Sequence, residues 1–130
     1  MSRLAYMDTS AMAKLILDEP GSTAMARWYV ESERIVTSRM GIVEMRRVAA
    51  RHAHDVAHLE VVLRSVETFE LDAPVARVAA AVAPAALRTL DAIHLASAIA
   101  LLPEIDAFVT YDDRLADAAR SAGLPVVRPA

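Results

Sequence analysis

Short runs of β-branched and aliphatic residues alternate along the chain with longer stretches in which apolar residues recur at helical spacing. The short runs predict strands at residues 3–7, 34–37, 68–71, 107–111 and 125–127. The longer stretches predict helices at residues 9–17, 22–32, 39–52, 55–65, 72–84, 90–102 and 112–123. Strands that alternate with helices are typical of a parallel sheet covered on both faces. The pattern therefore predicts a three-layer α/β/α sandwich with a parallel sheet of about five strands.

The size and composition of the chain fit one domain, which we expect to span residues 1–130. No stretch reaches the roughly 18 uninterrupted apolar residues that a membrane span requires. Met1, Ser2 and Arg3 lead into a strand-like run without a signal-peptide pattern. The absence of cysteine excludes disulfides and thiolate chemistry, and it agrees with a reducing compartment. We therefore expect a cytoplasmic protein that does not cross a membrane.

The charge balance gives no general sign of nucleic-acid binding, because the net charge is −3 and the isoelectric point is near 5.8. Local charge is more informative. The basic residues are almost all arginines, and Arg39, Arg46, Arg47 and Arg51 lie close to Glu44 in the sequence. Guanidinium groups suit bidentate contacts with phosphate, although an arginine-rich helix face is also typical of a merely solvated surface.

Four acidic residues occupy positions that an α/β fold brings together. Asp8 and Asp112 follow predicted strands, Asp91 opens a predicted helix, and Glu44 lies inside an unusually apolar helical run. Since functional groups of open parallel sheets gather at the carboxyl ends of the strands, these side chains can share one crevice. Carboxylates packed closely at neutral pH repel one another unless some protonate or a hard divalent cation neutralises them.

Each acid also has an ordinary structural interpretation. Asp8, Asp91 and Asp112 all stand at helix starts, where a carboxylate accepts backbone N–H bonds as an N-cap. Glu44 could instead form an ion pair with Arg47 or Arg88. His94 lies one helical turn beyond Asp91, and we interpret it as a histidine packed within the helix layer rather than as a general base.

Four segments carry a resemblance to a known family. They are Tyr6-Met7-Asp8-Thr9-Ser10-Ala11, residues 37–47 with Glu44, Leu90-Asp91-Ala92-Ile93-His94-Leu95-Ala96, and Thr110-Tyr111-Asp112-Asp113-Arg114-Leu115. In this order, over almost the whole chain, they resemble PIN domains and more narrowly the VapC-type ribonuclease toxins of type II toxin–antitoxin pairs. The resemblance implies a sandwich around a parallel sheet of about five strands.

The resemblance also implies roles for individual residues. It places catalytic and metal-binding roles on Asp8, Glu44, Asp91 and Asp112, with one or two Mg²⁺ or Mn²⁺ ions. Ser10 and Thr110 match polar positions that support the ligands by hydrogen bonds, and Asp113 could share or compete for the role of Asp112. Candidates for holding substrate phosphates are Arg39, Arg46, Arg47 and Arg88.

The function that follows from the resemblance is metal-dependent endoribonuclease activity, with metal-activated water leaving 5′-phosphate and 3′-hydroxyl ends. A cognate antitoxin and self-association as a homodimer are the implied partners. A receiver-like phosphotransfer domain is a weaker alternative, because it needs a late lysine and none follows Lys14. A second alternative is a non-catalytic interaction module whose acids bind a structural cation or the basic tail of a partner.

Overall fold

A parallel sheet runs through the centre of the computed structural model, which describes residues 3–130. Met1 and Ser2, which begin the segment examined for a signal peptide, lie outside the described residues. The strands are β1 (Leu4–Met7), β2 (Arg34–Ser38), β3 (Glu67–Phe69), β4 (Ile105–Val109) and β5 (Val126–Val127). Their order in the sheet is β3-β2-β1-β4-β5, and all neighbouring pairs are parallel.

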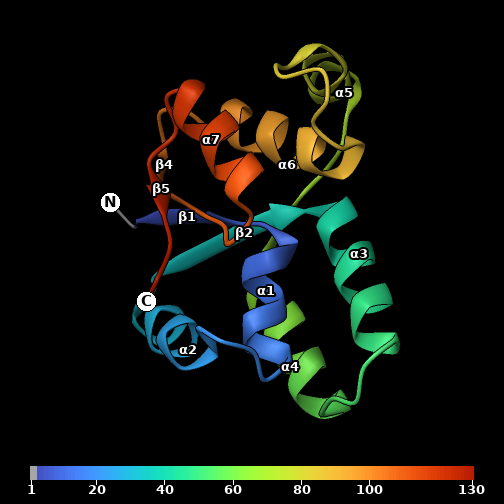
Figure 1. The fold of residues 1–130 in the computed structure, drawn as a ribbon, viewed down its shortest axis with the longest axis vertical. Helices are drawn as coiled ribbons and strands as arrows, with labels where there is room; N and C mark the ends of the chain where they lie inside the picture. Colours follow the sequence, from blue (N-terminus) through green and yellow to red (C-terminus); the bar gives the residue numbers. More distant parts are fainter. Residues whose placement is uncertain (1–2) are drawn as a thin grey trace.

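Helices cover both faces of this sheet. They are α1 (Thr9–Ile16), α2 (Ser22–Glu31), α3 (Arg39–Ala50), α4 (Val56–Ser65), α5 (Ala73–Ala81), α6 (Thr89–Ala100) and α7 (Asp113–Ser121). Figure 1 shows α1 to α4 on one side of the strands and α5 to α7 on the other. The predicted three-layer sandwich with a parallel sheet of five strands is confirmed. Within residues 3–130, no helix is both long enough and apolar enough to span a bilayer.

The alternation of side chains along the central strand β1 supplies both hydrophobic cores. Ala5 and Met7 pack into the cluster formed with α1 to α4, which also buries Met12 and Met45. Leu4 and Tyr6 point to the opposite face, where the cluster includes residues of α6 and α7 such as Leu95 and Leu115. Because successive side chains of a strand alternate between faces, a strand of four buried residues can anchor both layers.

The order of the strands creates a crevice at the carboxyl ends of the central strands β1 and β4. From β1 the chain moves to β2 and β3 on one side, and it then returns to place β4 and β5 on the other side. Ligands of open α/β sheets bind outside the carboxyl ends of the strands at such a reversal. Tyr6 pairs with Phe108 and Met7 with Val109, so the residues that follow β1 and β4 emerge side by side.

Polar residues cap most of the helices, and one of the predicted caps needs correction. Asp8 and Asp112 cap α1 and α7 as predicted, and Ser38 and Asp72 cap α3 and α5. Ser22 does not cap α2, because Gly21 takes that position with φ of 92°. The Ser22 hydroxyl instead donates to the Leu17 carbonyl. Asp91 is not an N-cap either, since α6 begins two residues earlier and places it in the first turn.

Gly41 allows α3 to approach α6 closely. A Cβ atom at this position would lie 2.8 Å from His94 Cε1 and 2.8 Å from Thr37 Oγ1. Both side chains are buried, so neither can move away without disturbing its own contacts. Elsewhere in a helix, glycine costs about 1 kcal/mol relative to alanine. The close approach therefore explains a glycine at a position where helix propensity alone disfavours one.

We expect Gly41→Ala to lower the free energy of unfolding by about 1–3 kcal/mol, because the added methyl group overpacks the contact between α3 and α6. Urea denaturation measures the effect. If the site had room for a methyl group, the gain in helix propensity would instead make the variant more stable than the wild type, and that result would contradict the close approach.

Candidate functional site

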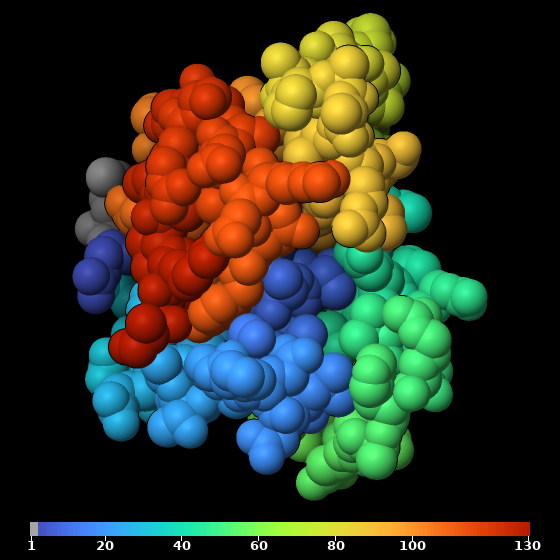
Figure 2. Space-filling model, viewed as in Figure 1, coloured from blue at the N-terminus to red at the C-terminus, as the bar shows by residue number. Residues whose placement is uncertain are grey.

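The four acids singled out in the sequence line one cavity of about 450 Å³ at the carboxyl ends of β1 and β4. Glu44 comes from α3 and Asp91 from α6, whereas Asp8 and Asp112 follow the two strands. Thr9, Ser10, Arg88 and His94 also line it. In Figure 2 the segments that carry these residues, α1 in blue, α3 in green and the orange stretch at the start of α7, meet near the middle of the visible face.

Asp8 is the most deeply placed of the four acids, with 2% of its surface exposed. Its carboxylate accepts hydrogen bonds from the Ser10 hydroxyl at 2.7 Å, the Ala11 N–H at 2.9 Å and the Thr110 hydroxyl at 2.6 Å. Burial raises the pKa of Asp8, while His94 and the hydrogen-bond donors partly oppose that rise. The carboxylate is thus held rigidly where positive charge would stabilise its ionised form.

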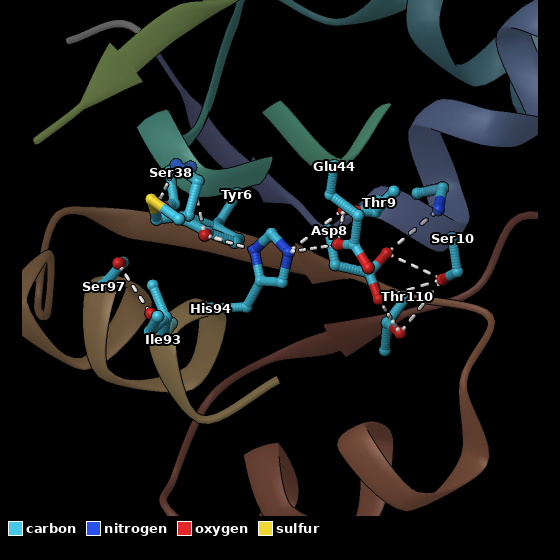
Figure 3. A network of polar contacts seen from close by, with 12 residues as sticks. Tyr6, Asp8, Thr9, Ser10, Ser38, Glu44, Ile93, His94, Ser97 and Thr110 are labelled. Atoms are coloured by element: carbon cyan, nitrogen blue, oxygen red, sulfur yellow. Dashed lines mark hydrogen bonds and ion pairs between the residues drawn. The ribbon is translucent and has the colours of Figure 1, made fainter. Parts of the chain in front are cut away.

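Glu44 reaches the cavity from a helix and is held by residues of two other helices. The Thr9 hydroxyl donates to Glu44 Oε1 at 2.5 Å, and His94 Nε2 lies 3.7 Å from the same oxygen (Figure 3). The pKa of Glu44 is lowered, chiefly by His94 and also by Thr9 and Arg88, against the effect of burial. Glu44 forms no ion pair within 4 Å with Arg47 or Arg88 in the part of the chain that the structure describes.

Asp91 and Asp112 complete the cavity from the opposite side of the sheet. Asp112 caps α7 by accepting the Leu115 N–H at 3.0 Å, and its own N–H donates to the Thr110 hydroxyl at 3.0 Å. Asp91 is half-buried. Burial and the neighbouring carboxylate of Asp112 raise the pKa of Asp91, with further contributions from Asp8 and Glu44. These effects are the electrostatic sign of like charges gathered around one space.

The donor set suits a hard divalent cation, because it consists of carboxylate and hydroxyl oxygens with no thiolate. Among residues 3–130, no three acidic or imidazole groups converge closely enough to enclose an ion by themselves. Mg²⁺ tolerates such an open arrangement, since it keeps several of its waters and is bound through only one or two carboxylates. The cavity therefore has the chemistry and the room for a partly hydrated ion.

The arginines considered in the sequence analysis occupy different places relative to the cavity. Arg39 forms an ion pair with Glu70 at 2.6 Å and Arg46 forms one with Glu60 at 2.7 Å, and neither lines the cavity. Arg88 does line it. Arg47 lines a smaller hollow of about 260 Å³ that also includes Glu44 and Leu90, both of which belong to the main cavity as well. Arg51 lies in the same hollow.

Of the three residues expected to support the acids, two contact the site and one does not. Ser10 and Thr110 both contact the Asp8 carboxylate. Asp113 points away from the cavity, with 87% of its side chain exposed and an ion pair to Arg128 at 2.7 Å. Sequence reasoning missed Thr9, whose only signal was a hydroxyl next to Asp8 at a helix start. It placed His94 correctly in the helix layer but did not foresee its polar contacts.

A family model described as the PIN domain matches residues 5–121, and the chain belongs to that family. It is 39% identical over 132 residues to "Ribonuclease VapC47" of Mycobacterium tuberculosis (strain CDC 1551 / Oshkosh), covering 97% of each chain. The resemblance drawn from the four sequence segments is confirmed.

Solved structures share this fold. The Mycobacterium tuberculosis VapC20 toxin, described as cleaving the Sarcin-Ricin loop, superposes with a TM-score of 0.75 at 18% identity, over 96% of this chain and 99% of that one. VapBC2 from Rickettsia felis, bound to a DNA fragment from its promoter, superposes with a TM-score of 0.70 at 12% identity, over 98% and 99% of the two chains.

The repulsion around Asp91 leads to a prediction about stability. Because the pKa of Asp91 is raised in the folded state above its ordinary value of 3.8, its ionised form destabilises the folded chain at neutral pH. In EDTA at pH 7 we therefore expect Asp91→Asn to unfold at a higher temperature than the wild type. As the pH falls toward 3.8 the difference should shrink, since the wild-type carboxyl then protonates.

Thermal melts between pH 4 and pH 8 measure this effect, and added Mn²⁺ is expected to stabilise the wild type more than the variant. A variant that melts below the wild type at pH 7 in EDTA would contradict the electrostatic interpretation of the cavity.

Proposed function

We propose that the protein is a Mg²⁺- or Mn²⁺-dependent endoribonuclease that acts as the toxin of a toxin–antitoxin pair. The observation that carries this proposal is the convergence of Asp8, Glu44, Asp91 and Asp112 on one cavity at the switch point of the sheet. Membership of the PIN-domain family and similarity to proteins named as VapC ribonucleases support it. Similarity to proteins that are named as ribonucleases favours this proposal over the non-catalytic alternative.

In this proposal the four acids hold one or two divalent ions, directly and through water. Such ions, when bound, would lower the pKa of water so that hydroxide is available near neutral pH, and they would offset charge that develops on the phosphate. The residues of the chain keep the ligands in place. Ser10, Ala11 and Thr110 fix both oxygens of Asp8, and Asp112 is fixed by the start of α7.

The substrate is RNA, which must approach a strongly acidic cavity. Arg88 at the cavity wall and Arg47 in the adjoining hollow are the arginines placed to bind its phosphates. The water oxygen bonds to phosphorus while the bond from phosphorus to the 3′ oxygen breaks, and a proton passes to that oxygen. The products therefore carry 5′-phosphate and 3′-hydroxyl ends.

The partners we propose are a small antitoxin and a second copy of the chain. The fold similarity to VapBC2, a complex bound to DNA from its own promoter, supports an antitoxin that also binds DNA. RNA as the substrate places the activity in the cytoplasm.

We expect Asp8→Asn to lower kcat for RNA cleavage by at least about 10²-fold, because the change removes charge from the most rigidly held ligand. The assay is cleavage of a fluorescent RNA by purified protein with Mn²⁺, with EDTA as the blank. Undiminished Mn²⁺-dependent cleavage by the purified variant would contradict a catalytic role for Asp8.

Asp112 and Asp113 provide a test variant and its matched control in the same assay. Asp112→Asn keeps a good N-cap residue at the start of α7 yet removes a carboxylate from the cavity, so it should also lose activity. Asp113→Asn changes an exposed carboxylate paired with Arg128 and should cleave RNA within about twofold of the wild type. The reverse result would assign the role of the fourth acid to Asp113 instead of Asp112.

The arginines make a separate prediction about substrate binding. Arg88→Ala and Arg47→Ala should raise the KM for RNA several-fold and reduce its dependence on salt, because each removes a phosphate contact. Arg39→Ala and Arg46→Ala are the matched controls, since both arginines are engaged by glutamates outside the cavity. Equal effects of all four changes would point to general charge rather than to local contacts.

A further inference from the structure

We propose that Tyr6, His94 and Thr9 form a one-directional hydrogen-bond relay that orients the Glu44 carboxylate in the cavity, with Thr9 as its last positioning residue. This inference rests on the proposed function, because Glu44 is there a metal ligand. It concerns side chains other than the four acids. Figure 3 shows these side chains in a row from β1 through α6 to α1 and α3.

The direction of the relay is set at its buried end. The Ser38 backbone N–H donates to the Tyr6 hydroxyl at 3.1 Å, so this oxygen already accepts one hydrogen bond. A phenol carries its own proton at neutral pH, and His94 Nδ1 lies 2.6 Å from the hydroxyl oxygen. In the proposed relay Nδ1 accepts this proton, and the proton of the neutral imidazole then stands on Nε2.

The same logic continues on the other side of the imidazole ring. Nε2 lies 3.2 Å from Thr9 Oγ1 and donates to it. A hydroxyl that accepts from the histidine uses its own proton for another partner, and the Glu44 Oε1 atom lies 2.5 Å away. Nε2 itself lies 3.7 Å from this oxygen, which is beyond hydrogen-bond distance, so the Thr9 hydroxyl is the link between the ring and the carboxylate. The second oxygen of Glu44 is left for a ligand in the cavity.

The surrounding packing keeps the relay from rotating. Tyr6 stacks on Phe108 at a centroid distance of 5.4 Å and meets the His94 ring edge-on. Tyr6 and His94 are at most 1% exposed. Gly41 places the α3 backbone directly against His94 Cε1, so the ring cannot swing toward that helix. A histidine that served only as hydrogen-bond partner of the buried Tyr6 would need no partner on its other ring nitrogen. Here that nitrogen contacts the Thr9 hydroxyl, which in turn contacts the Glu44 carboxylate.

The test uses Thr9→Val, which keeps the shape of the side chain and removes the hydroxyl, and Thr9→Ser, which keeps the hydroxyl. The first readout is Mn²⁺ affinity by calorimetry without RNA. We expect Thr9→Val to bind Mn²⁺ about 10–100-fold more weakly than the wild type, and Thr9→Ser to bind within about threefold of it. In RNA cleavage, Thr9→Val should lower kcat by a similar factor and leave the KM for RNA within about twofold.

Two further variants separate positioning from general stability. Ser32→Ala removes a hydroxyl that donates to the Trp28 carbonyl at 2.8 Å and does not line the cavity, and it should leave Mn²⁺ affinity and kcat unchanged. Tyr6→Phe removes the proton that fixes the imidazole tautomer, so the ring proton can move to Nδ1 and leave a bare Nε2 facing Thr9. We expect a loss of Mn²⁺ affinity that is smaller than for Thr9→Val.

The relay is overturned if Thr9→Val binds Mn²⁺ as tightly as the wild type, or if Thr9→Ser binds it as poorly as Thr9→Val. It is equally overturned if Ser32→Ala weakens Mn²⁺ binding as much as Thr9→Val does. A wild type that binds Mn²⁺ but cleaves no RNA would refute the proposed nuclease alone, because the affinities still decide the relay. A wild type that binds no Mn²⁺ would refute both.

Discussion

Repulsion among carboxylates that share one cavity is the constraint around which this fold is arranged. Three of the four acids are fixed by backbone or hydroxyl donors: Asp8 by Ala11 and two hydroxyls, Asp112 by the start of α7, and Glu44 by Thr9. Burial raises the pKa of both Asp8 and Asp91, and at Asp91 the charges of the other three carboxylates add to that rise. The rest of the structure supplies rigidity, since donors that point at a charge in a protein interior stabilise it only while they stay in place.

The central strand links this site to both hydrophobic layers. Tyr6 belongs to the core on the α6 and α7 side, yet its hydroxyl ends at the polar network behind the cavity. Met7 belongs to the opposite core, and the next residue is Asp8. Because every residue of β1 is buried, a shift of this strand would move both cores and the acid together. The location of the site is therefore tied to the packing of the whole sheet.

The periodicity of the sequence was sufficient to predict the layers, the parallel sheet and the residues at the carboxyl ends of β1 and β4. The same reasoning placed Asp8 and Asp112 near each other, because strand ends are readable from local pattern. It could not tell Arg88 from Arg39, since the partner of Arg39 is Glu70, on a different segment. Nor could it find the contact of Thr9 with Glu44, which depends on how α1 and α3 pack.

The contact between Gly41 and His94 limits how this chain can diverge. An imidazole ring and a bare backbone fit together there, with no space for a methyl group between them. During neutral drift, neither position can therefore accept a larger residue by itself. A smaller residue in place of the histidine must come first, at the cost of the polar network, and Thr37 must also give way, because its hydroxyl oxygen would lie equally close to an added Cβ atom. We infer that the glycine is the last of these residues to change, so that diverged descendants without Gly41 also lack His94.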